Sequence, residues 1–263
     1  MTASDDAGAE DAEDVDDADS TSPPALVAGV GETLGAALAR EFATERPVAV
    51  LARTGDTVDA LAADLRDDGQ DAVAVTGDVT DRESVAAAAS EVRDAFGAVG
   101  VVVHNASALG GGTVDDCSAD AFESTWRVRA KGGYHLAREF VDDLRETGGA
   151  LLFSGTNYAT EPAGTLADWD SAAAATRGLA RSLARDLEPD GVHVAYLALA
   201  GTVVPSDGFG GGGGSDDADG DDPPLVDGRM PASRVARAFR EVAAQDRGAW
   251  TRELTLEPPR FAE

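Results

Sequence analysis

Short apolar runs alternate with longer stretches of helical periodicity along most of this chain, and this alternation restricts its fold more than any other feature. After the first run, for example, Leu34, Leu38 and Phe42 recur at helical spacing. Runs joined by helices of this length predict parallel strands with right-handed crossovers and helices on both faces of the sheet. We therefore expect an α/β fold, a single doubly wound domain whose ligands bind at the carboxyl ends of the strands. The expected strands are 25–29, 47–52, 72–76, 99–104, 150–154, 192–199 and 253–256, and the expected helices are 34–42, 58–65, 85–96, 122–144, 166–187 and 235–244.

Two acidic segments without basic residues fall outside this alternation. Residues 1–24 hold nine acids and end in two prolines, which predicts a disordered acidic tail. Residues 206–224 contain five consecutive glycines followed by aspartates, which predicts a flexible loop within the folded domain. We expect that domain to span 25–257, with a C-terminal tail over 258–263.

The charge balance excludes several partners. With 21 lysines and arginines against 49 aspartates and glutamates, the chain carries a formal charge of −28, which excludes a nucleic-acid partner recognised through a basic surface. No apolar run approaches the roughly 20 residues that span a bilayer, and the N-terminus lacks the basic start of a signal peptide. We therefore expect no membrane association and a cytoplasmic location. Lys131 is the one lysine, and an acid excess with almost no lysine resembles the proteins of extreme halophiles.

Residues that commonly hold metals or form disulfides are sparse. Cys117 is the one cysteine, so it has no partner in this sequence for a disulfide or a cysteine metal site. His104, His135 and His193 are scattered, and we expect them to pack rather than to take part in catalysis. The sequence therefore predicts no metal site.

A glycine-rich turn, Gly-Val-Gly-Glu-Thr-Leu-Gly, follows the first expected strand. Gly29 lies at the end of the strand, and Gly35 lies where the next helix approaches the sheet. Between them Gly31, Thr33 and Leu34 lead into the helix, where backbone N–H groups and the helix dipole can bind a pyrophosphate. The alternative is a tight turn that binds no ligand.

Five segments, in this order, resemble the short-chain dehydrogenase/reductase family over nearly all of residues 25–257. The turn just described is similar to the family's Thr-Gly-x-x-x-Gly-x-Gly, and His104-Asn105-Ala106-Ser107 is similar to its Asn-Asn-Ala-Gly. The remaining segments are Gly77-Asp78-Val79-Thr80-Asp81, Ser182-Leu183-Ala184-Arg185-Asp186-Leu187 and Gly191-Val192-His193-Val194.

This resemblance implies a Rossmann fold with a seven-stranded sheet, a nicotinamide cofactor, and a homodimer or homotetramer packed through the two long helices. By the same resemblance, Asp78 and Val79 contact the adenine, and Asn105, followed by Ala106, approaches the cofactor ribose. A small carbonyl compound or alcohol would be the substrate.

The end of the second expected strand favours NADP(H) over NAD(H). NAD-preferring members of the family place an acid there, whereas Arg53 and Thr54 offer a guanidinium and a hydroxyl suited to a 2′-phosphate. The alternative is that Arg53 is a solvated surface cation. Thr33 replaces the middle glycine of the family pattern, and Glu32 adds a negative charge near the expected pyrophosphate, so we expect weakened binding.

The catalytic residues of the family are largely replaced. Alignment on the segment that begins at Ser182 places the family's catalytic tyrosine at Trp169 and its lysine at Ala173. An indole has one N–H donor, and an alanine side chain has no group that transfers a proton. The serine position falls at Thr156, which keeps a hydroxyl, and the asparagine of the preceding helix falls at Arg129. Arg129 would bring positive charge to the pocket or pair with one of the many acids.

No other register restores the Tyr-x-x-x-Lys pair, because neither Tyr134, Tyr158 nor Tyr196 is followed by a lysine four residues on. We therefore expect an oxidoreductase by family whose catalysis is impaired or absent. Two alternatives stay open. One is an active NADP-dependent enzyme with an atypical proton donor, for which Tyr158 is a candidate if it is not simply a partly exposed loop residue. The other is a non-catalytic Rossmann module that binds a nucleotide or a protein partner.

Overall fold

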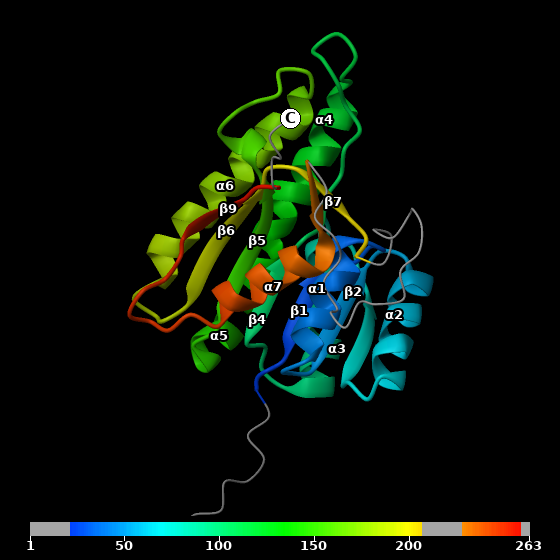
Figure 1. Ribbon diagram of the computed structural model, residues 1–263, viewed down its shortest axis with the longest axis vertical. Coiled ribbons are helices and arrows are strands. Elements are labelled where there is room, and N and C mark those ends of the chain that lie inside the picture. The colour runs from blue at the N-terminus through cyan, green and yellow to red at the C-terminus, as the bar shows by residue number, and fades with distance from the viewer. Residues whose placement is uncertain (1–21, 207–227, 259–263) are drawn as a thin grey trace, which may run out of the picture.

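The apolar runs form one seven-stranded parallel sheet in the computed structural model, which describes residues 22–206 and 228–258 (Figure 1). Its strands are β1 (Ala25–Ala28), β2 (Val48–Ala52), β3 (Ala72–Thr76), β4 (Val101–His104), β5 (Ala150–Thr156), β6 (His193–Leu199) and β9 (Glu253–Leu256). They lie in the order β3-β2-β1-β4-β5-β6-β9, so the winding reverses between β1 and β4. The expected doubly wound α/β fold is confirmed.

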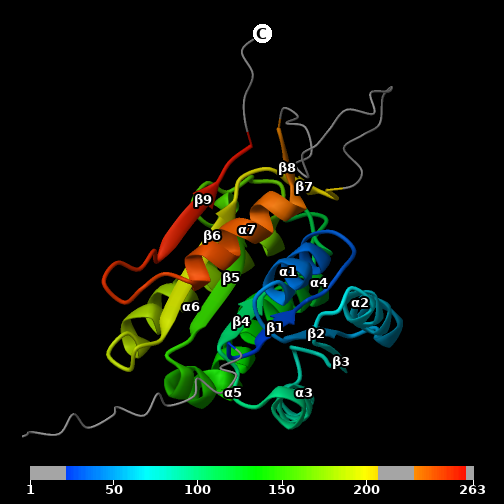
Figure 2. The ribbon, with the colours of Figure 1, turned by 60° about the horizontal axis from the view of Figure 1, so that its bottom comes forward.

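Helices cover both faces of this sheet. They are α1 (Leu34–Ala43), α2 (Gly55–Asp67), α3 (Arg82–Phe96), α4 (Ala119–Trp126), α5 (Gly132–Thr147), α6 (Ala167–Leu187) and α7 (Ala232–Ala243). Because successive strand residues point to opposite faces, Leu26 packs with residues of α3, α5 and α6, whereas Val27 packs with residues of α1, α2 and α7. Both views show α1 and α7 side by side on one face (Figures 1 and 2). The alternating pattern therefore produces two separate core layers.

The stretch 122–144, expected as one helix, is interrupted. A π-helical turn, η1 (Arg127–Lys131), separates α4 from α5. Such turns accommodate an extra residue and occur frequently at functional sites. Arg129 lies at the centre of this turn and is buried. The interruption therefore determines where the Arg129 side chain lies.

The segments predicted as tails and loop fall mostly outside the described residues. These segments are 1–24, 206–224 and 258–263. Pro24, at the end of the first of them, is buried, and its carbonyl accepts a hydrogen bond from the backbone N–H of Gly100 at 2.9 Å. Pro24 therefore belongs to the folded part of the chain.

A small second sheet extends beyond β6. It pairs β7 (Thr202–Val204) with β8 (Arg229–Pro231) in parallel, a pairing that the apolar periodicity did not predict. Across the two described ranges, every helix is too short or too polar to cross a bilayer.

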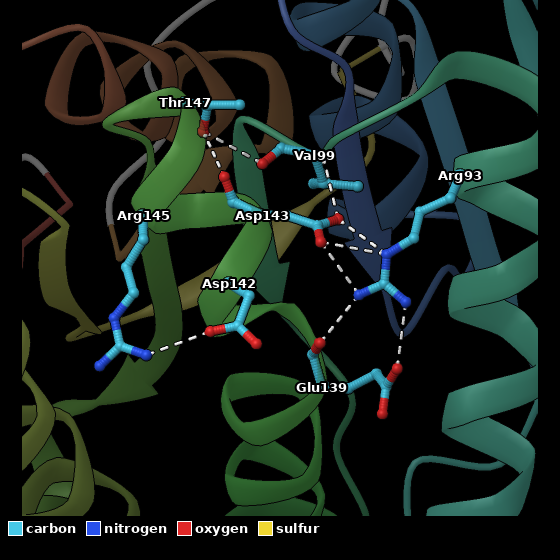
Figure 3. A network of polar contacts seen from close by, with 7 residues as sticks. All are labelled: Arg93, Val99, Glu139, Asp142, Asp143, Arg145 and Thr147. Carbon is cyan, nitrogen blue, oxygen red and sulfur yellow. Dashed lines mark hydrogen bonds and ion pairs between the residues drawn. The ribbon is translucent and has the colours of Figure 1, made fainter.

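A partly buried ion network joins α3 to α5 (Figure 3). Arg93 Nε lies 3.0 and 3.1 Å from the two carboxylate oxygens of Asp143, and Arg93 Nη1 lies 3.1 Å from Glu139 Oε1. The Asp143 carboxylate also accepts a hydrogen bond from the backbone N–H of Val99 at 3.2 Å. Asp143 is only 7% exposed, and Arg93 compensates its charge directly.

Candidate functional site

Two adjoining cavities lie near the carboxyl ends of the strands where the winding reverses. The first cavity measures about 400 Å³ and the second about 520 Å³. Leu34, Asn105 and Ser107 line both of them. All ten residues expected to contact a nucleotide line the first cavity: Gly29, Gly31, Thr33, Leu34, Gly35, Arg53, Asp78, Val79, Asn105 and Ala106.

The turn after β1 requires glycine at its first position. Gly29 has a φ of +99°, and a Cβ there would lie 2.2 Å from the backbone nitrogen of Ala106. Asn105 donates from its side-chain Nδ2 to the Gly29 carbonyl at 2.8 Å and from its backbone N–H to the Ala28 carbonyl at 2.7 Å. The end of β4 therefore holds this turn in place.

The other two glycines of the turn differ in their surroundings. A Cβ on Gly35 would lie 2.7 Å from Val30 Cα, so glycine allows α1 to pack closely against the turn. A Cβ on Gly31 would meet nothing within 4 Å, so this residue borders open space. Thr33 precedes α1 without a side-chain cap, which leaves the N–H groups of Leu34 and Gly35 at the start of the helix available to an anion. Glu32 is exposed at the same rim.

Residues from β2 and β3 line the opposite side of the first cavity. Arg53 follows β2, is exposed, and makes no ion pair or hydrogen bond with any described residue. Asp78 Oδ1 accepts the backbone N–H of Thr80 at 2.8 Å. His135 Nδ1 donates to the Val79 carbonyl at 2.9 Å, so α5 holds this loop from behind.

Three of the four expected catalytic positions meet at the second cavity. Thr156, Trp169 and Arg129 all line it. The guanidinium carbon of Arg129 lies 4.0 Å from the centre of the Trp169 ring, and Arg129 Nη1 donates to Ser107 Oγ at 2.7 Å. Ala173 lies one turn after Trp169 on α6, is fully buried, and does not line the cavity.

Tyr196, on β6, fixes the position of Thr156. Its hydroxyl accepts the backbone N–H of Thr156 at 2.9 Å and donates to the Thr156 carbonyl at 3.0 Å. A Cβ on Gly155 would lie 2.0 Å from the Tyr196 ring. Burial raises the pKa of Tyr196, so its hydroxyl stays protonated. Sequence reasoning missed this role, although glycine inside a strand is a signal of close approach.

Tyr158 lies in the turn η2 (Asn157–Ala159) and lines the second cavity. It is half-buried, and its backbone N–H donates a hydrogen bond to Thr156 Oγ1 at 3.4 Å. Tyr158 is therefore a partly exposed loop residue that also lines the second cavity.

His104 ends β4 behind these residues. Its Nε2 donates to the backbone carbonyl of Arg129 at 2.8 Å, and burial lowers the pKa of His104 to about 4. The imidazole is therefore neutral near pH 7, and its contacts are structural. No three His, Cys, Asp or Glu side chains within 22–206 and 228–258 are grouped to hold a metal ion.

Comparison with known proteins identifies relatives of this fold. The versicolorin reductase of Emericella nidulans is 30% identical over 138 residues, which is 52% of this chain and 52% of that protein. The 1-deoxy-11-beta-hydroxypentalenate dehydrogenase of Streptomyces exfoliatus is 32% identical over 178 residues, which is 66% of this chain and 65% of that protein. The match with the versicolorin reductase thus spans about half the length of each chain.

Solved structures share the architecture over almost the whole chain. The alcohol dehydrogenase of Thermococcus sibiricus, complexed with 5-hydroxy-NADP, has a TM-score of 0.76 and 25% identity, covering 92% of this chain and 98% of that one. The L-sorbose reductase of Gluconobacter frateurii, complexed with NADPH and L-sorbose, has a TM-score of 0.77 and 20% identity, covering 90% and 96%. The sequence pattern of short chain dehydrogenases matches residues 24–207. This chain therefore belongs to the short-chain dehydrogenase family.

Proposed function

We propose that this protein binds NADP(H) in the first cavity and catalyses ordinary carbonyl reduction very slowly or not at all. The observation that carries the proposal is the composition of the second cavity, where Trp169 and Arg129 stack and Ala173 is buried. The family's acid–base pair aligns with Trp169 and Ala173, so the second cavity lacks the usual proton donor.

The residues of the first cavity fit a dinucleotide. Gly31 borders open space at the uncapped start of α1, where backbone N–H groups would hold the pyrophosphate. Arg53, without a partner among the described residues, would bind a 2′-phosphate. Asp78 and Val79 would contact the adenine, and Asn105 the ribose. When bound, the cofactor supplies or accepts a hydride. The relative from Thermococcus sibiricus was crystallised with a modified NADP, which supports this choice of cofactor.

The side chains of the second cavity favour the proposal that catalysis is weak. Trp169 presents only an indole N–H, and this Nε1 is buried without an acceptor. Thr156 keeps a hydroxyl, but a hydroxyl alone does not replace a tyrosine whose pKa a lysine lowers. Loss of a positioned general acid or base slows a reaction about 10²–10⁴-fold.

The test is a fluorescence titration of the full chain with NADPH and with NADH. We expect saturable enhancement of nicotinamide fluorescence, with NADPH binding more tightly than NADH. Absence of saturable binding by either nucleotide would overturn the cofactor assignment.

A second candidate function is NADP(H)-dependent oxidoreduction of a small carbonyl compound or alcohol, with the Tyr158 hydroxyl as proton donor. The lining of the second cavity by Tyr158 favours it. Under this alternative, Tyr158→Phe abolishes turnover, whereas Tyr134→Phe, on the exposed surface of α5, leaves it unchanged. Equal turnover in both variants would exclude Tyr158.

An oligomer belongs to the same proposal. Phe122, Trp126 and Tyr134 are large exposed side chains on α4 and α5, which supports a homodimer or homotetramer packed through the long helices. Light scattering after size exclusion distinguishes these states from a monomer.

We also propose that the protein works in the cytoplasm of a salt-accumulating cell. The formal charge of −28 supports this, because multimolar salt reduces the Debye length to about 3 Å or less and screens the repulsion among these charges. The expected result is a melting temperature that rises with KCl concentration up to the multimolar range.

A further inference from the structure

Arg129 is a buried cation without a counter-ion. Its side chain is 5% exposed, and it is the one arginine classed as buried among the described residues. Nη1 donates to Ser107, whereas Nε is buried without an acceptor. No carboxylate in the described ranges pairs with this guanidinium, although the chain contains 49 acids.

The two buried carboxylates of the described residues, Asp143 and Asp168, differ in how their charge is met. Asp143 is held by Arg93 in the network of Figure 3. Asp168, at the start of α6, makes no ion pair with a described residue: its Oδ2 accepts hydrogen bonds from Thr125 Oγ1 at 2.6 Å and from the backbone N–H of Gly111 at 3.1 Å, and its Oδ1 is buried without a hydrogen-bond partner. An unpaired buried charge carries a large desolvation cost. Among the buried side chains of the described residues, Arg129 is the cation whose charge no carboxylate balances.

The titratable groups around Arg129 do not neutralise it. His104 donates to the Arg129 carbonyl and is neutral, since burial lowers its pKa to about 4. Tyr196, which interacts electrostatically with Arg129, is also neutral because burial raises its pKa. The second cavity thus carries a net positive charge beside the hydroxyls of Ser107, Thr156 and Tyr158.

We infer that the second cavity binds the carboxylate of a small organic acid, with Arg129 as its counter-ion and the lining hydroxyls as further hydrogen-bond donors. The cation–π contact with Trp169 holds the guanidinium against one wall of the cavity. The ligand's carboxylate compensates the charge that the protein itself leaves unpaired.

A carboxylate suits this cavity better than a phosphate. One guanidinium balances one negative charge, whereas a phosphate monoester carries about −1.5 to −2 at pH 7. The cavity of about 520 Å³ has room for a small oxo acid or hydroxy acid.

This inference goes beyond cofactor binding and does not require turnover. The test is calorimetric titration of the full chain, at constant ionic strength, with pyruvate, 2-oxobutanoate and 2-oxohexanoate. 2-Oxobutanamide serves as the uncharged analogue, and inorganic phosphate as the competing anion. We expect at least one oxo acid to bind saturably and 2-oxobutanoate to bind about tenfold or more tightly than its amide.

Arg129→Met should weaken binding of the oxo acid about tenfold or more, and Arg129→Lys should keep part of the affinity. Lys131→Gln is the matched control, because it removes one positive charge from the exposed side of the same π turn and should leave affinity unchanged. Far-UV circular dichroism checks that each variant is folded. If Arg129→Met does not fold, Arg129→Lys and the amide comparison decide.

Four results would overturn the inference: no saturable binding of any oxo acid, equal binding of 2-oxobutanoate and its amide, unchanged affinity in the folded Arg129 variants, or tighter binding of phosphate. A separate NADPH titration keeps the two proposals apart. Binding of oxo acid without NADPH binding would remove only the cofactor assignment, and NADPH binding without oxo acid binding would remove only this inference.

Discussion

The two adjoining cavities differ in the groups that form them: mainly backbone groups in the first and side chains in the second. The first depends mainly on backbone: the close approach at Gly29, the open space at Gly31 and the N–H groups of the first two residues of α1. The second depends on side chains, chiefly the stack of Arg129 on Trp169 and the anchoring of Thr156 by Tyr196. A backbone cradle tolerates changes of side chain around it, whereas an acid–base site requires particular groups at particular atoms. We therefore expect nucleotide binding in the first cavity and altered chemistry in the second.

The largest expected effect comes from rebuilding the second cavity. Trp169→Tyr combined with Ala173→Lys should raise the rate of NADPH oxidation by carbonyl compounds about 100-fold or more over the unmodified chain, because it supplies a proton donor and the cation that lowers its pKa. Stopped-flow absorbance measures the rate. Because Ala173 is fully buried, thermal melting must first show that the lysine is accommodated. A folded double variant that binds NADPH and gains no activity would contradict this assignment of the two positions.

The next effect separates two glycines of the first cavity. Gly29→Ala should lower the free energy of unfolding by about 2–3 kcal/mol, because its Cβ would collide with Ala106 and its φ is positive. Gly31→Ala should change stability little, since its Cβ meets nothing within 4 Å, yet weaken NADPH binding. Urea unfolding and fluorescence titration measure the two effects. Equal destabilisation by both substitutions would contradict the distinction.

A pH effect arises from His104, which is buried at the end of β4. Burial lowers the pKa of His104 in the folded state to about 4, whereas the ordinary pKa of a histidine is about 6.5. Below about pH 6.5 the unfolded chain therefore binds more protons than the folded chain. Stability should therefore fall as the pH decreases, and this histidine alone contributes about 2 kcal/mol of loss between pH 8 and pH 5. Urea unfolding of His104→Gln should show a shallower pH dependence. An unchanged slope would mean that His104 titrates normally in the fold.

The smallest expected effect concerns the choice of cofactor. Arg53→Ala should reduce the preference for NADPH over NADH about tenfold, because it removes the cation placed for the 2′-phosphate. Fluorescence titration with both nucleotides measures the ratio, and Arg138→Ala on the exposed face of α5 is the control. A preference that survives Arg53→Ala would return Arg53 to the role of a solvated surface cation.

The sequence predicted the layers of the fold better than the contacts inside the second cavity. Apolar runs such as 47–52 identify strands because burial on both sides of a parallel sheet leaves little room for polar residues. The turn that starts at Gly29 was also predicted, because the spacing of its glycines reflects backbone geometry. The π turn Arg127–Lys131 was not predicted, because one extra residue in a turn hardly alters the apolar spacing of a long helix.

Side-chain encounters between distant segments were the least predictable. The stack of Arg129 on Trp169 joins residues 40 positions apart in sequence, and nothing local marks either as a partner. The role of Tyr196 depends on β6 lying beside β5, where its hydroxyl reaches the Thr156 backbone. Sequence placed Thr156, Trp169 and Arg129 near one pocket by family resemblance, but their contacts follow from packing in three dimensions.

The most direct test of the account is to measure binding and turnover of NADPH in one sample of the unmodified chain. NADPH is brought to saturation in multimolar KCl, and its oxidation is followed after adding a panel of small aldehydes, ketones and oxo acids. The account predicts saturable NADPH binding with oxidation at or near the rate without protein. Rapid oxidation by the unmodified chain, abolished by Tyr158→Phe, would contradict it and establish an active enzyme with a different proton donor.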